Sequence, residues 1–241
     1  MMTLTAKQRM LNAYRGVNSD TVPVAPEFWI YYPAKLLGLD IIAFEREVPF
    51  HLALKTTFET FGCEGWGIAT PAELNPHVEV KSVLKKLDNG TYRDRQTVVC
   101  DGRAFTRSYI YSDDEPFWSE EFAVSSAEDA RTFFNAYVNE DVQFDFTDAI
   151  KAHGEVGGTF LLEMDLGLSF FDFFEQAMGF ENALYYFMDE DEAALSDMLG
   201  RYIAFKSRQV REVIEKTPFE AFFIGCSSSC VALLGPELWR K

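Results

Sequence analysis

The sequence predicts an α/β protein with a parallel sheet and an inserted antiparallel layer. Short apolar runs typical of strands alternate with long stretches of helical periodicity, which indicates βα units. Between residues 78 and 111 the period changes, and two tight-turn sequences, Asp88-Asn89-Gly90 and Asp101-Gly102, separate runs rich in β-formers. We therefore expect a three-stranded antiparallel meander at 78–87, 91–99 and 104–111.

The remaining elements follow from apolar periodicity, capping residues and turn residues. Thr5 is placed to cap a helix that Gly16 ends. Ser126 is placed to cap another, and Asp129 completes a capping box. The expected helices span 6–15, 33–38, 41–46, 49–62, 126–138, 145–153, 169–178, 181–188 and 191–216. The other expected strands span 22–28, where two prolines suit strand ends or an edge, and 65–70, 158–163 and 219–225.

Composition and charge limit the classes of function. The chain has 241 residues, 48% of them hydrophobic, and a formal net charge of −16. It can bury a large core, and its negative charge argues against nucleic acid and anionic membranes as partners. It has no run resembling a membrane span or signal peptide, and neither a dinucleotide-binding nor a P-loop glycine motif. The four cysteines are spread out, so we expect a cytoplasmic protein with reduced thiols.

Three groups of residues form a recognisable arrangement by their order and spacing. They are Thr5 to Ala13 with Gly16, Asp20 and Val22-Pro23-Val24; Met178 to Asn182; and Ile224-Gly225 with Gly235 to Arg240. Together they resemble the uroporphyrinogen decarboxylase superfamily. That group includes porphyrinogen decarboxylases and zinc-dependent methyltransferases that move methyl groups to or from corrinoids and thiols. The resemblance implies a (β/α)8 barrel of the TIM type.

The resemblance also implies that one domain, residues 1–241, contains only the first half to two-thirds of such a barrel. About four barrel strands are expected by residue 225, whereas closure needs eight. Gly235-Pro236-Glu237 is typical of the first turn of a helix, shortly before the sequence stops. We expect a chain truncated at its C-terminus and inactive alone. Its open sheet edges predict self-association or pairing with a C-terminal half.

Barrel enzymes carry their chemistry at the C-terminal ends of the strands. Glu163 and Asp165 are two residues apart and would point to the same side of a strand, which suits acid–base or metal chemistry, although Asp165 could instead cap the following helical region. Glu27 lies among aromatic residues and could have a raised pKa, or could pair with a lysine or a helix N-terminus. The catalytic candidates are Glu27, Glu163 and Asp165, and the substrate-binding candidates are Trp29, Tyr31, Thr70, Cys226 and Ser228. We expect them to line one concave face.

The resemblance to the decarboxylases implies an arginine after the first strand and an aspartate at the end of the second. Glu27 to Tyr31 contains no arginine, and Gly67 to Thr70 contains no aspartate. A carboxylate among aromatic rings disfavours a polyanionic porphyrinogen. The expected function is therefore methyl transfer between a small methylated substrate and a corrinoid or thiol. Two alternatives remain: uroporphyrinogen III decarboxylase, a lyase of porphyrin biosynthesis, and a non-catalytic barrel portion that acts through a partner chain.

The zinc ligands that the methyltransferase branch implies, a His-x-Cys pair and a later cysteine, do not occur in the sequence. Cys226 and Cys230 lack the second pair that a structural zinc site needs, and small residues that let a strand end turn tightly account for them better. No metal or cofactor is assigned to this chain. Zinc, a corrinoid and a partner corrinoid protein would belong to a complete family member.

Overall fold

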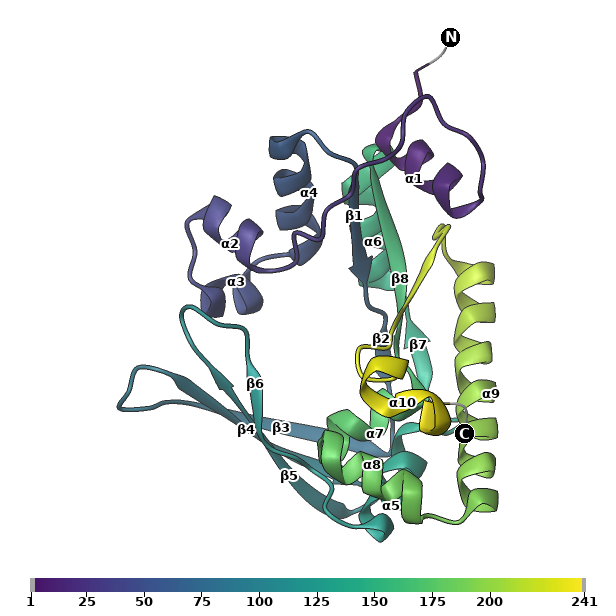
Figure 1. Ribbon diagram of the computed structural model, residues 1–241. Coiled ribbons are helices and arrows are strands. Elements are labelled where there is room, and N and C mark those ends of the chain that lie inside the picture. Colours follow the sequence, from purple (N-terminus) through teal and green to yellow (C-terminus); the bar gives the residue numbers. More distant parts are fainter. Residues whose placement is uncertain (1–2, 240–241) are drawn as a thin grey trace.

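A computed structural model describes residues 3–239 and shows an α/β protein with a parallel sheet at its centre (Figure 1). The sheet has the order β1-β8-β9, formed by β1 (Gly65–Ala69), β8 (Phe160–Leu168) and β9 (Phe222–Gly225). Both pairings are parallel, and Gly65 lies opposite Phe160 while Met164 lies opposite Phe222. Three of the expected parallel strands are thus neighbours, and helices lie in the connections between them, as βα units require.

The strand expected at 22–28 is wrong. That segment is extended, but it does not pair with β1 as a strand. It contacts Glu64, the residue before β1, through one backbone hydrogen bond and one hydrogen bond to the Glu64 side chain, whereas a ladder would use backbone groups for both. The Glu64 N–H donates to the Val24 carbonyl at 3.0 Å, and the Val24 N–H donates to the Glu64 carboxylate at 2.7 Å. Pro23 and Pro26 have no backbone N–H, so the segment lacks donors that a regular ladder needs. The parallel strands before residue 225 therefore number three rather than four.

The predicted meander is confirmed, and it is extended by a fourth strand. The antiparallel sheet runs in the order β3 (Val78–Lys86), β4 (Tyr92–Cys100), β5 (Arg103–Tyr111) and β6 (Trp118–Glu121). Asp101 and Gly102 both have positive φ, 48° and 85°, as the tight turn between β4 and β5 requires. Two further short strands, β2 (Ala72–Leu74) and β7 (Gln143–Asp145), pair antiparallel and were not expected.

The helices lie close to their expected positions. Gln8 N–H donates to Thr5 Oγ1 at 3.2 Å, and Asp129 N–H donates to Ser126 Oγ at 3.1 Å, so both predicted caps form. The helices are α1 (Ala6–Tyr14), α2 (Tyr31–Leu37), α3 (Ile41–Glu47), α4 (Phe50–Phe61), α5 (Ala127–Tyr137), α6 (Thr147–Val156), α7 (Phe170–Met178), α8 (Phe180–Asp189), α9 (Glu192–Lys216) and α10 (Val231–Trp239). Gly235, with a φ of 73°, breaks α10 just before Pro236. Within residues 3–239, no helix combines the length and apolar character needed to cross a bilayer.

Alternate side chains of β8 enter two different environments. Phe160, Leu162 and Met164 are at most 2% exposed and belong to the main core, together with side chains of α4, α6 and α9. Leu161 points to the other face, where it packs with Met10 of α1 and Ala221. We call this second face, which α1 covers at the N-terminal ends of the strands, the inner face of the parallel sheet.

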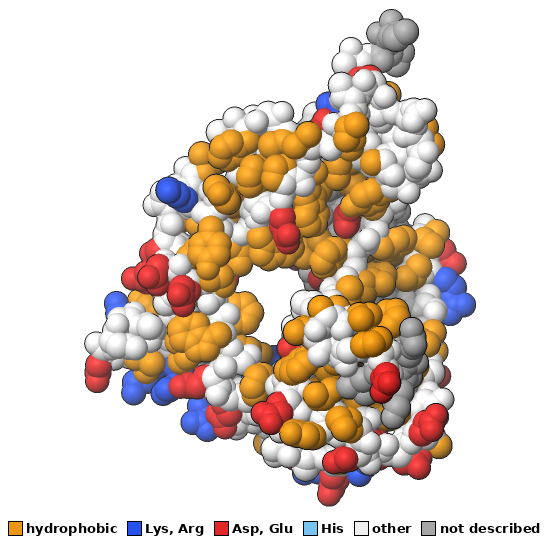
Figure 2. Space-filling model, viewed as in Figure 1, with side chains coloured by type: hydrophobic (Ala, Val, Ile, Leu, Met, Phe, Trp, Pro, Cys, Tyr) orange, Lys and Arg blue, Asp and Glu red, His pale blue; other side chains and the backbone are white. Residues whose placement is uncertain are grey.

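The view of Figure 2 shows an opening through the middle of the molecule, bordered largely by hydrophobic side chains. In Figure 1 the same region lies between α2 and α3 above, the antiparallel sheet below and α10 to the side. The antiparallel sheet therefore stands away from the parallel sheet at this level. It is attached to the rest of the molecule through the main core, to which Val98 and Phe105 belong along with Phe133 of α5.

His77 fastens the antiparallel sheet to the loop before β7. Its ring nitrogens lie 2.7 Å from Asp101 Oδ1 and 2.9 Å from Asp141 Oδ2. The hydrogen bonds with Asp141 and Asp101 raise the pKa of His77 above its ordinary value of 6.5. Because the pKa is higher in the folded state, this contribution to stability is complete below the unfolded pKa and is lost as the pH rises through the folded pKa.

We therefore predict that His77→Gln removes a pH-dependent part of the free energy of unfolding. In urea denaturation, the difference between wild type and variant should be larger at about pH 6 than at about pH 9. Asp141→Asn should reduce the same difference, because a neutral amide does not favour the protonated ring. A wild-type advantage that grows with pH would contradict the assignment.

Candidate functional site

Glu163 and Asp165 share the inner face of the parallel sheet. They occupy the same side of β8 as Leu161, because side chains alternate along a strand. Ile68 of β1 lies opposite Glu163, and Phe223 of β9 lies opposite Asp165. Asp165 is the nearer of the two carboxylates to the C-terminal end of the strand, the end at which barrel enzymes place their chemistry.

Asp165 is held by the ends of two strands. Thr70, which directly follows β1, donates its hydroxyl to Asp165 Oδ2 at 3.0 Å, and the Gly167 N–H donates to Oδ1 at 2.7 Å. Gly167 has a φ of 80°, in the left-handed region that favours glycine, and the β8–β9 register shifts between Asp165 and Leu168. Both oxygens of Asp165 are thus oriented where the ladder is interrupted.

Glu163 lies deeper and under α1. Its side chain accepts a hydrogen bond from the Tyr14 hydroxyl, and the residue is 3% exposed. Burial raises the pKa of Glu163, and the Tyr14 hydrogen bond only partly opposes that effect. Burial and the neighbouring carboxylate also raise the pKa of Tyr14. The pair is therefore disposed to hold protons rather than to release them.

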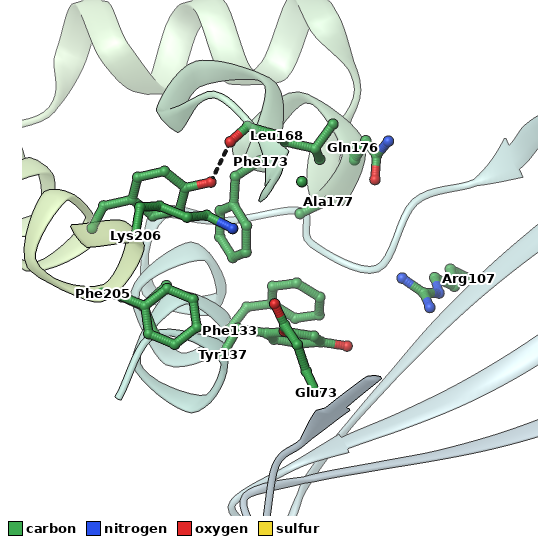
Figure 3. A pocket seen from close by; sticks show the side chains of 13 residues that line it. Glu73, Arg107, Phe133, Tyr137, Leu168, Phe173, Gln176, Ala177, Phe205 and Lys206 are labelled. Atoms are coloured by element: carbon green, nitrogen blue, oxygen red, sulfur yellow. Dashed lines mark hydrogen bonds between the residues drawn. The ribbon is translucent and has the colours of Figure 1, made fainter. Parts of the chain in front are cut away.

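Beyond the end of β8 lies a cavity of about 200 Å³, shown in Figure 3. Glu73 of β2 and Lys206 of α9 reach into it from different sides, and Arg107 faces it from β5. Its walls include several aromatic side chains and the bend of β8: Phe133, Tyr137, Phe173, Tyr202, Phe205, Gly167 and Leu168. The cavity is a space for a small molecule, with charged groups around an aromatic lining.

Lys206 and Glu73 shift one another's ionisation. Burial lowers the pKa of Lys206, an effect that Glu73 and Asp165 oppose. Glu73 is an exposed residue of β2, and partial desolvation of its carboxyl group raises its pKa, while Lys206 acts in the opposite direction and Asp165 adds to the rise. These mutual effects place the cavity and Asp165 in one electrostatic neighbourhood. Glu73 and Lys206 line the same cavity without forming an ion pair within 4.0 Å, and an acid with a raised pKa and an amine with a lowered pKa can exchange protons closer to neutrality than either isolated group.

The backbone around the bend of β8 is capped by α9. Lys206 donates its ammonium to the Leu166 carbonyl, and the Tyr202 hydroxyl donates to the Leu168 carbonyl at 2.6 Å, the bond drawn in Figure 3. The Lys206 Nζ atom also donates a hydrogen bond to Gln209 Oε1 at 3.3 Å. The sequence analysis missed Glu73 and Lys206, since neither belongs to a motif and only the fold brings them together.

Asp172 organises the loop that follows β9, and it too was missed. Ser228 N–H donates to Asp172 Oδ1 at 2.8 Å, and the hydroxyls of Ser169 and Ser229 donate to Oδ2. Although burial alone would raise it, these hydrogen bonds lower the pKa of Asp172, which is 1% exposed. The spacing Ser169-x-x-Asp172 is a capping-box signal that could have indicated the cap, but not the contact with the serine loop.

The predicted site residues are only partly brought together. Thr70 and Asp165 are in contact, and Glu163 shares their face. Trp29 stacks on Trp66 of β1, with ring centroids 6.0 Å apart and an interplanar angle of 28°. Trp66 alternates with Ile68 and Thr70 along β1, so Trp29 belongs to the inner face as well.

The other candidates stand apart from this group. Glu27 is exposed, and its side chain forms no hydrogen bond or ion pair within residues 3–239. Tyr31 begins α2 and is 53% exposed. Cys226 is exposed, whereas Ser228 is buried and bound to Asp172. The part of the chain that the structure describes contains no group of three or more His, Cys, Asp or Glu residues placed to hold a metal ion.

Comparisons of this chain with protein families, with curated proteins and with solved structures found no match. Functional inference therefore rests on the geometry described above.

Asp172→Asn should destabilise the protein, because the amide replaces one acceptor oxygen by a donor facing the serine hydroxyls and N–H. We expect a loss of about 3 kcal/mol in the free energy of unfolding, the order found when a buried, hydrogen-bonded charge loses its partners. Urea denaturation measures the loss. Asp189→Asn, at an exposed position of α8, is the matched control and should change stability by less than about 0.5 kcal/mol. Equal effects of the two substitutions would show that Asp172 does not organise the loop.

Proposed function

We propose that this chain supplies strands of a (β/α)8 barrel of the uroporphyrinogen decarboxylase type and acts in methyl transfer between a small methylated substrate and a corrinoid or thiol. Three features support the barrel. The parallel strands pair in chain order, helices lie in their connections, and α1 covers the inner face at the N-terminal strand ends. The polar side chains gather at the opposite ends, where barrel enzymes bind their substrates.

The observation that carries the functional proposal is the end of β8, where Asp165 and Thr70 lie in the same electrostatic neighbourhood as the Glu73–Lys206 cavity. A volume of about 200 Å³ suits a compound smaller than a typical drug and excludes a tetrapyrrole. This volume favours a small methylated substrate over the decarboxylase alternative.

In this proposal the residues of the chain bind the substrate and donate or accept the proton that the reaction requires. Glu73 and Lys206 line the cavity and exchange a proton with the group that loses or gains the methyl. Asp165 and Thr70 lie outside the cavity lining and orient the part of the compound that reaches the end of β8. A bound corrinoid or a thiol would supply the other methyl-carrying centre. Among the described residues no group of three or more His, Cys, Asp or Glu is placed to hold a metal ion, so the proposal assigns zinc to no residue of this chain.

A second role, as a barrel portion that acts through a partner chain, is favoured by β9. This strand pairs with β8 on one edge, and no strand formed by residues 3–239 pairs with its other edge. Phe222 and Ile224 are 36% and 54% exposed there. Unpaired strand edges with apolar side chains pair with other chains. We propose that β9 joins a strand of a second copy or of a separate C-terminal half.

Binding of neutral methylated probes tests the methyl-transfer proposal. Saturation-transfer NMR should detect methanol and dimethyl sulfide bound to the wild-type protein. Asp165→Asn should weaken the binding of methanol about tenfold, the equivalent of one charge-assisted hydrogen bond from its hydroxyl to the carboxylate. Dimethyl sulfide has no hydrogen-bond donor, so its binding should change less. Asp197→Asn, at an exposed position on α9, should have no effect. Saturable binding of uroporphyrin, with no binding of either methylated probe, would instead support the decarboxylase alternative.

The edge of β9 gives a separate prediction. Light scattering should show self-association of the wild-type chain at micromolar concentrations, and Ile224→Lys should shift it toward the monomer, because a charged side chain blocks edge pairing. Ile203→Lys, at a similarly exposed position on α9, should leave association unchanged. A wild-type protein that stays monomeric and captures no separately expressed C-terminal half would rule out the partner role.

A further inference from the structure

A second cavity, of about 310 Å³, lies between the α2–α4 helices and the end of β5. Five aromatic rings from separate segments line it: Trp29, Phe44, Phe50, Tyr111 and Phe117. Phe50 meets Trp29 edge to face at 5.3 Å and Phe44 at 6.0 Å, while Tyr111 and Phe117 lie 5.5 Å apart on the other side. The rings therefore surround the space from two sides rather than forming one flat wall.

Glu45 of α3 also lines this cavity and lacks compensation for its charge. Its Oε2 atom is buried and has no hydrogen-bond partner within the described part of the chain, the only such side-chain atom found there. No basic side chain of residues 3–239 lies within 4.0 Å of its carboxylate. Burial also raises the pKa of Glu45. Glu45 as a whole is half-buried, but a buried carboxylate oxygen without a partner is unfavourable, so the site is chemically incomplete as it stands.

The nearest cation on the same helix does not complete it. Arg46 also lines the cavity, but it places its guanidinium over the Tyr111 ring, 6.0 Å from the centroid, and forms no ion pair with Glu45 within 4.0 Å. Consecutive residues on a helix point in different directions, which keeps Arg46 from turning back onto Glu45. The same contact shows that a cation can lie against Tyr111 of this lining.

We propose that this cavity binds a small alkylammonium cation. The methyl groups of such a cation spread its positive charge over an apolar surface that fits against aromatic faces, and it needs no hydrogen-bond acceptor. Its charge compensates the carboxylate of Glu45. Arg46 lies over Tyr111, so the ligand is expected next to Glu45, where an anion would be repelled and a neutral apolar molecule would leave the carboxylate uncompensated.

This site is distinct from the one proposed for methyl transfer and does not depend on it. The two share Trp29, which contacts Trp66 of β1 with one part of its ring system and Phe50 of α4 with another. Glu45 lies on α3, Tyr111 ends β5 and Phe117 directly precedes β6, and none of them is a hydrogen-bond partner of Asp165. Substitutions can therefore separate the two sites.

Isothermal titration with tetramethylammonium chloride and with choline chloride, at constant ionic strength, tests the proposal. Both salts should bind with a saturable, stoichiometric isotherm. The neutral isostere of choline, 3,3-dimethylbutan-1-ol, should bind at least about fivefold more weakly, as expected when a cation–aromatic attraction of about 1 kcal/mol is lost. Equal binding of choline and the neutral isostere, or no saturation by either cation below about 10 mM, would overturn it.

Variants locate the binding. Glu45→Gln and Tyr111→Leu should each weaken choline binding at least about fivefold. Glu47→Gln, two residues along α3 and exposed, is the matched control and should not. Glu45→Gln should also keep or increase the melting temperature, because it removes a buried uncompensated charge, so lost binding cannot be ascribed to unfolding. Undiminished choline binding by Glu45→Gln would place the cation elsewhere and refute the assignment.

The two proposed sites can fail separately. Asp165→Asn should leave choline binding intact, and Glu45→Gln should leave the binding of methanol and dimethyl sulfide intact. If Asp165→Asn abolishes choline binding and Glu45→Gln does not, the proposal that the aromatic cavity binds the cation is wrong, whereas the proposed site at the end of β8 is not contradicted.

Discussion

β8 pairs with β1 along one edge and with β9 along the other, and its side chains alternate between two environments. This double constraint determines what lies on each face of the parallel sheet. Even-numbered side chains from Phe160 to Leu166 are fully enclosed under the helices, and odd-numbered ones face the inner side. At the end of the strand the left-handed Gly167 interrupts the ladder with β9. Beyond this point Asp165 accepts a hydrogen bond from Thr70, which follows β1, and the backbone carbonyls of β8 accept hydrogen bonds from Lys206 and Tyr202 of α9. The candidate site is thus built from the groups that face one another where regular pairing stops.

Buried carboxylates in this acidic protein differ mainly in how many donors reach them. Asp172 receives hydrogen bonds from three serine hydroxyls and the Ser228 N–H, and hydrogen bonds of this kind lower its pKa even though burial opposes the change. Glu163 receives one, from Tyr14, and burial prevails. The buried oxygen of Glu45 receives none, and burial raises the pKa of that side chain too. The same residue class therefore serves as a structural anchor, a proton-holding group or an unfilled charge, depending on the hydrogen bonds around it. Functional inferences can be based on Glu163 and Glu45, because few or no hydrogen bonds stabilise the charged forms of these two side chains.

Local sequence signals predicted the elements well where the deciding interaction is itself local. The turn sequence Asp101-Gly102 specified a tight reversal, and Thr5 and Ser126 specified helix starts through bonds that span three residues. The segment at 22–28 misled, because its apolar pattern is that of a strand while its prolines remove ladder donors. β2 and β7 were missed because strands of three residues are too short to show a period. Within the site, alternation alone placed Glu163 and Asp165 on one side of a strand. It did not reveal Tyr14 over Glu163, a contact between segments far apart in the chain.

By itself, the sequence determined the inserted meander, most helix boundaries, the βα character of the rest and the face shared by the two β8 carboxylates. These features depend on dihedral preferences, caps and periodicity, which act over a few residues. Only the tertiary structure decided which polar groups meet. Glu73 and Lys206, Asp172 and the serine loop, and Glu45 with Tyr111 and Phe117 come from separate elements whose juxtaposition depends on packing the whole core. The pKa of each group depends in turn on burial and on those neighbours, and neither exists until the chain is folded.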